Sequence, residues 1–175
     1  MAEYESPQAE VFGEGHHPNT ETAFLELYRL LAIIFASKRF AELRVGHGKK
    51  WEALDHLQQF EDDEITRILL AVSITARVID DRNKKVFDLV ARDCGTLIDM
   101  TVKGTSETGL SLREACKKII HAKKVRFDTS ELDTTQKYLN TVIYLYGERH
   151  KGQEWKAVLD VVTFAEEYVS CLRNL

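Results

Sequence analysis

Residues 61–80 of the chain read EDDEITRILLAVSITARVID. The four acidic residues at the start suit the first turn of a helix, where the backbone dipole favours negative charge. Two apolar stripes follow at helical spacing and leave the helix apolar nearly all round: Ile65, Ile68, Leu69, Val72, Ala76 and Ile79 on one side, and Leu70, Ile74 and Val78 on the other. A helix of this kind usually lies at the buried centre of a bundle. Residues 61–80 therefore predict a central helix around which other helices pack.

Apolar residues recur at spacings of three and four along most of the remaining chain, which is typical of amphipathic helices. Polar loops and glycines divide this pattern into separate segments. We expect five or six helices, with approximate bounds 20–44, 51–60, 61–80, 86–103, 112–122 and 155–172. The predicted fold is therefore a mainly α, irregular helical bundle.

Two segments before the last helix have the composition of strands. Residues 125–127 and 142–146 are rich in β-branched and aromatic side chains, which favour extended structure. We expect them to pair as a short two-stranded antiparallel ribbon before the C-terminal helix. One alternative stays open here, because residues 153–159 either begin that helix or add a third strand to the ribbon.

Composition limits the class of protein and its setting. The chain has 175 residues, of which 44% are hydrophobic and 30% are charged, and its formal net charge is −4. These values fit one globular domain, predicted for residues 20–175, after a mobile arm over residues 1–19 that lacks apolar periodicity. The first residues do not form a secretory signal, and the longest apolar run, residues 30–36, is too short to cross a bilayer. We expect a cytoplasmic protein without membrane contact.

The cysteines and histidines predict no metal centre. Cys94, Cys116 and Cys171 are far apart and lack CxxC spacing, so we expect reduced thiols in the core rather than disulfides or a zinc site. His16 and His17 are adjacent but have no third ligand nearby. No sequence motif indicates a cofactor.

Two polar groups interrupt the apolar pattern. Arg77, Asp80 and Asp81 lie at helical spacing, where they form either a charge pair that closes the central helix or a site that orients a phosphate. The turn over residues 147–152, GERHKG, is basic but lacks the spacing of a phosphate-binding loop. Its Arg149 and Lys151 are therefore either solvated or in contact with an anion.

The clearest candidate site is the basic helix over residues 112–121. A helical projection places His121 opposite the apolar face, with Lys117 one turn before it and Arg113 at the edge of the apolar stripe. An imidazole beside fixed cations provides the groups that acid–base cleavage of a phosphodiester requires. Alternatively, the basic residues only complement the dipole at the helix C-terminus. We expect phosphate contacts from the basic residues near this helix end and the later turn: Lys118, Lys123, Lys124, Arg149 and Lys151.

At this helix the sequence resembles the HEPN superfamily, the higher eukaryote and prokaryote nucleotide-binding domains. Arg113, the polar residue Glu114 and His121 match the family motif, with a gap before the histidine that is one residue longer than usual. The resemblance implies a helical bundle, an RNA partner and a homodimer in which two motifs meet in one cleft. It also implies a metal-independent endoribonuclease or a catalytically decayed relative, as in toxin and phage-defence systems, with Arg113, Lys117 and His121 as catalytic residues.

A noncatalytic protein-interaction module is the alternative function. Tyr138, Tyr144, Tyr146 and Trp155 each combine a large apolar ring with a polar tip, which is common in binding hot spots. These rings either form an exposed patch that binds another protein or pack the ribbon against the bundle.

Overall fold

The computed structural model describes residues 19–44, 56–83, 86–101, 104–132, 136–149 and 152–173. Its helices are α1 (Thr20–Arg44), α3 (Glu61–Asn83), the short 3-10 helix η2 (Val86–Leu89), α4 (Leu112–Ile120) and α5 (Val161–Arg173). Its strands are β1 (Gly95–Thr101), β2 (Gly104–Gly109), β3 (Lys124–Glu131), β4 (Lys137–Glu148) and β5 (Glu154–Asp160). Nearly all of the predicted mobile arm, half of the predicted second helix, and Lys151 lie outside the described residues.

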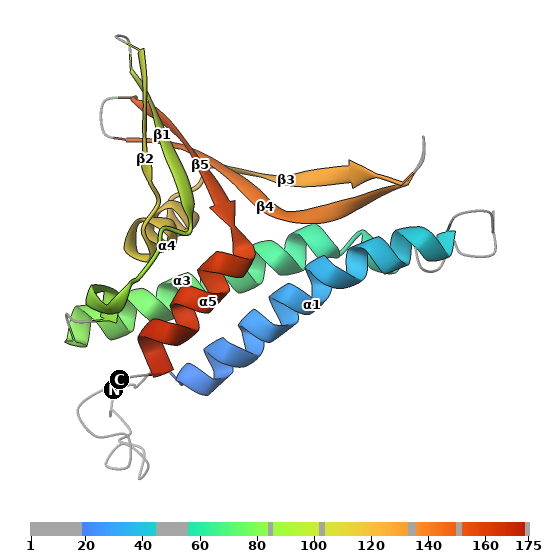
Figure 1. Ribbon diagram of the computed structural model, residues 1–175, viewed down its shortest axis with the longest axis horizontal. Coiled ribbons are helices and arrows are strands. Elements are labelled where there is room, and N and C mark those ends of the chain that lie inside the picture. Colours follow the sequence, from blue (N-terminus) through green and yellow to red (C-terminus); the bar gives the residue numbers. More distant parts are fainter. Residues whose placement is uncertain are drawn as a thin grey trace, which may run out of the picture.

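The five strands form one antiparallel sheet in the order β2-β1-β5-β4-β3. Within the described part of the chain, the helices lie on one side of this sheet and leave the other side uncovered (Figure 1). Alternation along β5 reflects the two sides, because Trp155, Ala157 and Leu159 are buried whereas Lys156 and Val158 are half-buried. The prediction of a mainly α bundle with a two-stranded ribbon is therefore wrong. The protein has a mixed fold in which a sheet layer rests on a helix layer.

Two segments that were expected to be helical form strands instead. Residues 95–101 form β1, and residues 154–160 form β5, which settles the open alternative at residues 153–159 in favour of a strand. Gly95 has φ 146°, and a Cβ there would collide with the carbonyl oxygen of Val158, so the backbones of β1 and β5 approach closely. Short apolar segments fit both the helical and the strand period, and pairing within the sheet decides between them here.

The expected pairing between residues 125–127 and 142–146 is confirmed and lies at one end of the β3–β4 ladder. Val125 lies opposite Leu145, and Phe127 lies opposite Ile143. Both strands are longer than predicted, and β5 and β1 extend the sheet beyond them. The ribbon is thus one part of a larger sheet.

Helices α1 and α3 lie side by side in opposite directions beneath the sheet (Figure 1). Their buried residues, among them Leu27, Leu30, Ile65 and Ile68, meet the buried face of the sheet in one core. However, α3 is not buried all round. Its second apolar stripe, Leu70, Ile74 and Val78, is exposed to solvent, which contradicts the prediction of a central helix enclosed by others.

Ser37 joins three elements at one end of the helix layer. Its side chain is fully buried, and its hydroxyl donates to Glu61 Oε2 at 3.0 Å in α3. Ser37 Oγ also accepts hydrogen bonds from the side-chain amide of Gln58 at 3.2 Å and from the backbone N–H of Leu139 in β4 at 3.1 Å. Ser37 therefore fixes the distance between α1, the start of α3 and the sheet.

Glu167 joins α5 to the segment that precedes β1. Its buried carboxylate accepts hydrogen bonds from the backbone N–H of Ala91 at 2.9 Å and from Nε of Arg92 at 3.0 Å. Burial alone would raise the pKa of Glu167, but these hydrogen bonds outweigh it and the pKa is lowered. The contacts of Glu167 with Ala91 and Arg92 therefore stabilise the folded state as long as the carboxyl group is ionised.

The cysteines are free and buried, as expected for core thiols. Burial is the main cause that raises the pKa of Cys94 and Cys116 to about 12 and that of Cys171 to about 11, so all three stay protonated near neutral pH. In the described residues, no helix has the length and apolar character needed to cross a membrane.

Candidate functional site

Ser111 caps the N-terminus of helix α4. Ser111 Oγ accepts a hydrogen bond from the backbone N–H of Glu114 at 3.4 Å, which satisfies one free donor of the first turn. The apolar face of α4 packs into the core with Leu112, Ala115 and Cys116. His121 ends the helix at the opposite side, exposed to solvent. The cap and the apolar face thus fix which α4 side chains point away from the core.

Lys118 departs from the pattern of an exposed basic residue. It is only 4% exposed, and its Nζ lies 4.4 Å from the centre of the Trp155 ring on β5. None of the described residues places a carboxylate within ion-pair distance of this ammonium group. Burial, with a smaller contribution from the nearby Arg149, lowers the pKa of Lys118. A buried cation without a carboxylate partner is a strong point of attraction for an anion.

Lys118 lies in the wall of an open cavity of about 600 Å³ between α4 and the sheet. Lys117, His121 and Arg149 line the same cavity, so four of the predicted site residues come together here. The acidic residues Glu114 and Glu148 also line it. Lys117 lies 3.4 Å from Glu114, and Arg149 Nη2 lies 2.9 Å from Asp99 Oδ2, which leaves Lys118 as the lining lysine or arginine without an ion pair among the described residues. We call this space the α4 cavity.

A second hollow lies next to the α4 cavity and shares Glu148 and Trp155 with it. This second hollow is also lined by Lys123, Lys124 and Tyr146. Basic residues therefore continue from α4 past the end of β4 to the uncovered face of the sheet. Lys123 is paired with Glu148 at 2.7 Å. The site therefore extends from a cavity under the sheet to the open side of the sheet.

Gly147 shapes the boundary between these two hollows. A Cβ at this position would collide with the indole ring of Trp155, its partner across the β4–β5 ladder. Because Gly147 has no side chain, the indole of Trp155 can lie directly against the β4 backbone, where its ring contacts Lys118. This use of glycine depends on space and not on an unusual backbone conformation.

Aromatic and basic residues alternate on the uncovered face of the sheet. Tyr146 lies opposite Lys156 of β5, and Tyr144 lies opposite Arg126 of β3. Lys156 Nζ lies 4.5 Å from the centre of the Tyr144 ring and 5.9 Å from that of Tyr146, and the Arg126 guanidinium lies 5.4 Å from Tyr146. We call these four residues, with Lys124, the aromatic–basic row.

Asp128 holds one end of the aromatic–basic row in place. The hydroxyl of Tyr144 donates to Asp128 Oδ1 at 3.1 Å, and this hydrogen bond raises the pKa of Tyr144. Asn140 donates to the other oxygen of the same carboxylate at 2.8 Å. The hydrogen bond to Asp128 therefore fixes the position of the Tyr144 side chain before any ligand binds.

Arg113, expected in the site, lies elsewhere. Its guanidinium makes two contacts with the buried carboxylate of Asp80, at 3.2 and 3.1 Å, and lies 5.0 Å from the centre of the Phe87 ring. It does not line the α4 cavity, where Lys117 and His121 are found. The three residues predicted to act together are therefore divided between a structural ion pair and the cavity.

The polar pair predicted at the end of the central helix is also divided. Arg77 lies 3.8 Å from Asp81, one turn further along α3, whereas Asp80 is taken by Arg113 of α4. Both contacts fit the structural interpretation of this group, in which charge pairs close the helix and dock its neighbour.

Sequence reasoning missed Arg126, Lys156 and Asp99, which complete the site. Each lies on a strand, where side chains alternate between the two faces of the sheet. The face on which each side chain lies could therefore be predicted only from the strand register. Of the four aromatic anchors predicted, Tyr144 and Tyr146 lie on the uncovered face, whereas Trp155 is buried. The fourth, Tyr138, is half-buried, and Lys38 Nζ of α1 lies 5.6 Å from the centre of its ring. Lys151 lies outside the described residues.

The chemistry of the site favours anion binding. Lysine and arginine side chains attract phosphate or carboxylate groups, and the imidazole of His121 is placed to exchange a proton with a group bound in the cavity. Within the described segments, His, Cys, Asp and Glu side chains form no group of three that could hold a metal ion.

Comparison of the chain with protein-family models, with curated proteins and with solved structures finds no match.

Proposed function

We propose that the protein binds single-stranded RNA without cleaving it, across the aromatic–basic row and into the α4 cavity. The observation that carries this proposal is the row itself: two tyrosine rings on an uncovered sheet face, each with a cation against it. Proteins that bind single strands combine these two elements, because bases stack on aromatic rings while cations follow the backbone. The overall acidic charge of the chain makes this a local surface and not a global attraction.

Base stacking supplies the first part of the proposed interaction. Tyr144 and Tyr146 are two residues apart on β4, so their rings stand on the same side of the sheet, roughly 7 Å apart along the strand. Two successive unstacked bases span a similar distance. Lys156, between the rings, is then free to exchange its contact with them for a contact with a phosphate.

Phosphate binding supplies the second part. The strand would leave the sheet face past Lys124 and place a backbone phosphate in the α4 cavity, near Lys117, Lys118 and Arg149. Lys118 contributes most, because its ammonium group is already desolvated and has no carboxylate to give up. Glu114 and Asp99 act on this ammonium group only from beyond ion-pair distance, so a bound phosphate would add a counter-charge in direct contact.

The proposal is for binding rather than cleavage because of Arg113. The HEPN resemblance implies that this arginine acts beside His121, but its guanidinium is held by Asp80 and is not in the α4 cavity. The sheet also differs from the all-helical bundle that the resemblance implies. The proposal rests on the surface chemistry of the sheet and cavity, and not on the family motif.

Fluorescence anisotropy with a labelled single-stranded RNA of about 12 nucleotides tests this proposal. Tyr146→Ala should weaken binding by about 1–3 kcal/mol, roughly 5- to 150-fold, through the loss of one stacking surface. Lys118→Met should weaken binding and reduce the dependence of log affinity on log salt by about 0.7, the value for one phosphate contact. Lys137→Met, at the far end of β4 and paired with Glu131, is the matched control and should change neither quantity.

Three outcomes would contradict the proposal. Equal affinity for duplex and single-stranded RNA would rule out stacking, because bases in a duplex are not available to the tyrosines. A Lys137→Met effect as large as that of Lys118→Met would show nonspecific attraction. RNA cleavage in chelator that disappears in His121→Ala would replace the binding function with a catalytic one.

A further inference from the structure

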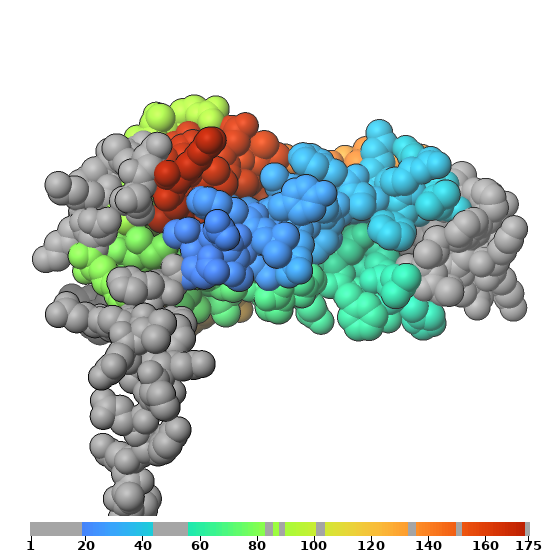
Figure 2. All heavy atoms as spheres, turned by 90° about the horizontal axis from the view of Figure 1, so that it is seen from below, coloured from blue at the N-terminus to red at the C-terminus, as the bar shows by residue number. Residues whose placement is uncertain are grey.

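The helix layer has an exposed apolar surface on the side that faces away from the sheet. Figure 2 views this side, with α1 and α3 running next to each other across it. Tyr28 is 71% exposed, Phe35 59% and Ile74 46%, which are high values for large apolar side chains. The surface includes three residues from each helix: Leu25, Tyr28 and Phe35 of α1, and Leu70, Ile74 and Val78 of α3.

These residues follow the helical repeat and are not scattered. Leu25, Tyr28 and Phe35 are separated by three and seven positions, and Leu70, Ile74 and Val78 by four, so each set forms a stripe along its helix. The two stripes belong to neighbouring antiparallel helices. Ile74 and Val78 also line the groove between the helices, whereas Leu25, Tyr28 and Phe35 are not among its lining residues. Exposed apolar stripes on two neighbouring helices are typical of a packing face.

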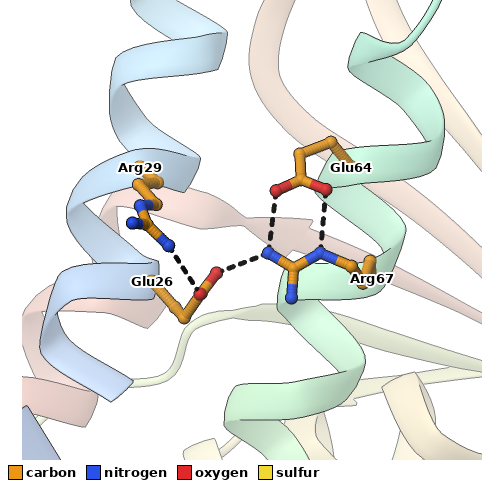
Figure 3. Close-up of polar contacts among 4 residues, drawn as sticks. All are labelled: Glu26, Arg29, Glu64 and Arg67. Atoms are coloured by element: carbon orange, nitrogen blue, oxygen red, sulfur yellow. Dashed lines mark hydrogen bonds and ion pairs between the residues drawn. The ribbon is translucent and has the colours of Figure 1, made fainter. Parts of the chain in front are cut away.

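A square of charged residues lies at the centre of this surface. Glu26 and Arg29 of α1 stand beside Glu64 and Arg67 of α3, with each arginine diagonally opposite the other (Figure 3). Arg67 lies 2.7 Å from both Glu26 and Glu64, and Arg29 lies 3.0 Å from Glu26. Arg29 and Arg67 are still about half exposed, at 53% and 50% of their side chains. We call these four residues the charge square.

Two hollows flank the charge square along the groove between the helices. Ala32, Ala36 and Phe60 line the one toward the start of α3, and Ala71 and Val78 line the one toward its end. Along the groove between the two helices, the charge square therefore lies between two mainly apolar hollows. Any partner must match this order.

A second copy of the same surface matches it. When a copy is turned by half a turn about an axis that lies in the interface parallel to the helices, Arg29 faces Glu64 of the copy. Arg67 then lies opposite Glu26 of the copy, whose side chain is 13% exposed between its own two arginines. Every arginine then meets a glutamate, and each apolar end meets the same apolar end. The turn also sets α1 against α3 of the copy in opposite directions, which is the arrangement of an antiparallel four-helix bundle.

We infer that the α1–α3 surface binds a second copy of this chain, and that the two helix pairs form a four-helix bundle. The available area is sufficient. The 25 residues of α1 extend for roughly 37 Å, and two adjacent helices make a surface roughly 20 Å wide, which gives about 700 Å² per copy. Stable interfaces bury about 800 Å² per partner. This interface uses neither the aromatic–basic row nor the α4 cavity, so it is independent of the proposed RNA function.

Sedimentation equilibrium of the full chain tests the association. We expect a dimer with a dissociation constant in the micromolar range or below. Ile74→Glu, at an exposed position, should weaken association at least tenfold without unfolding the protein, whereas Thr129→Glu on the sheet should have no effect. A wild-type protein that stays monomeric throughout, or an Ile74→Glu variant that associates as tightly as the wild type, would overturn the inference.

A mixing experiment tests the charge square itself. The variant with Glu26→Arg, Arg29→Glu, Glu64→Arg and Arg67→Glu keeps the pairs within each copy and reverses every charge. It should form dimers with itself, as the wild type does, but not with the wild type, because like charges would then face each other. Native mass spectrometry of a mixture with one mass-tagged protein counts the mixed dimers. Mixed dimers at the statistical one-half would show that the charge squares do not meet.

Discussion

Arg113→Met separates the structural role of this residue from the catalytic role that its sequence context implies. The substitution keeps the aliphatic contacts of the side chain but removes the guanidinium that Asp80 accepts, at 3.1 and 3.2 Å. Asp80 would then be a carboxylate with a side chain only 4% exposed and without its partner. The folded state should lose stability while the α4 cavity stays intact.

The expected loss follows from the burial of the two partners. Removal of one member of a buried ion pair costs about 3–5 kcal/mol, and the 44% exposure of the Arg113 side chain reduces this to about 2–3 kcal/mol. Loss of the contact with Phe87 adds about 0.5–1 kcal/mol. A total near 3 kcal/mol corresponds to a decrease in melting temperature of about 6–12 °C for a chain of this length.

Urea denaturation of Arg113→Met, Asp80→Asn and the double variant measures this effect. The two single losses should not add, with a coupling of about 2 kcal/mol, because the second substitution removes a contact that is already broken. RNA affinity, measured where each variant is folded, should equal that of the wild type. An Arg113→Met protein that is as stable as the wild type would contradict this prediction, whether or not it still binds RNA.

Three further changes test other contacts. Glu167→Gln should destabilise the protein by about 1–3 kcal/mol at pH 7. Because the folded pKa of Glu167 is lowered, its contribution is complete above the ordinary value of 4.5 and disappears as the pH falls through the folded value, so urea denaturation at pH 7 and below pH 4 should show the difference shrink. Gly147→Ala should cost about 1–3 kcal/mol by displacing Trp155, and a red-shifted tryptophan emission would report the displacement, whereas unchanged stability would contradict the close contact. Ser37→Ala should cost about 1–3 kcal/mol by leaving a buried N–H of β4 without an acceptor, and thermal denaturation with no shift in midpoint would show that water replaces the hydroxyl.

The sequence predicted the helices well where the apolar periodicity is long. Helix α1 has its predicted bounds, and α4 begins at the predicted residue, Leu112. It failed for β1 and left β5 undecided, because a seven-residue segment such as EWKAVLD fits a helical stripe and a strand equally well. Only the partners across the sheet decide between the two, and these partners are distant in sequence.

The candidate site was predicted in part for a related reason. Lys117, Lys118, His121 and Arg149 were identified from local composition, and the fold brings them together in one cavity. Spacing along α4 also suggested that Arg113 belongs with them, but its orientation depends on Asp80 in another helix. The row of rings and cations on the sheet depends on strand register, which local sequence does not specify.

The proposed RNA site consists of the uncovered face of the sheet and the adjacent α4 cavity. A titration of the ¹⁵N-labelled protein with single-stranded RNA, followed by amide NMR spectra, locates the contact directly. We expect shifts to concentrate in residues 117–126, 144–149 and 155–156, while amides of α1 and α3 stay in place. Shifts confined to α1 and α3, or no shifts at saturating RNA, would contradict it.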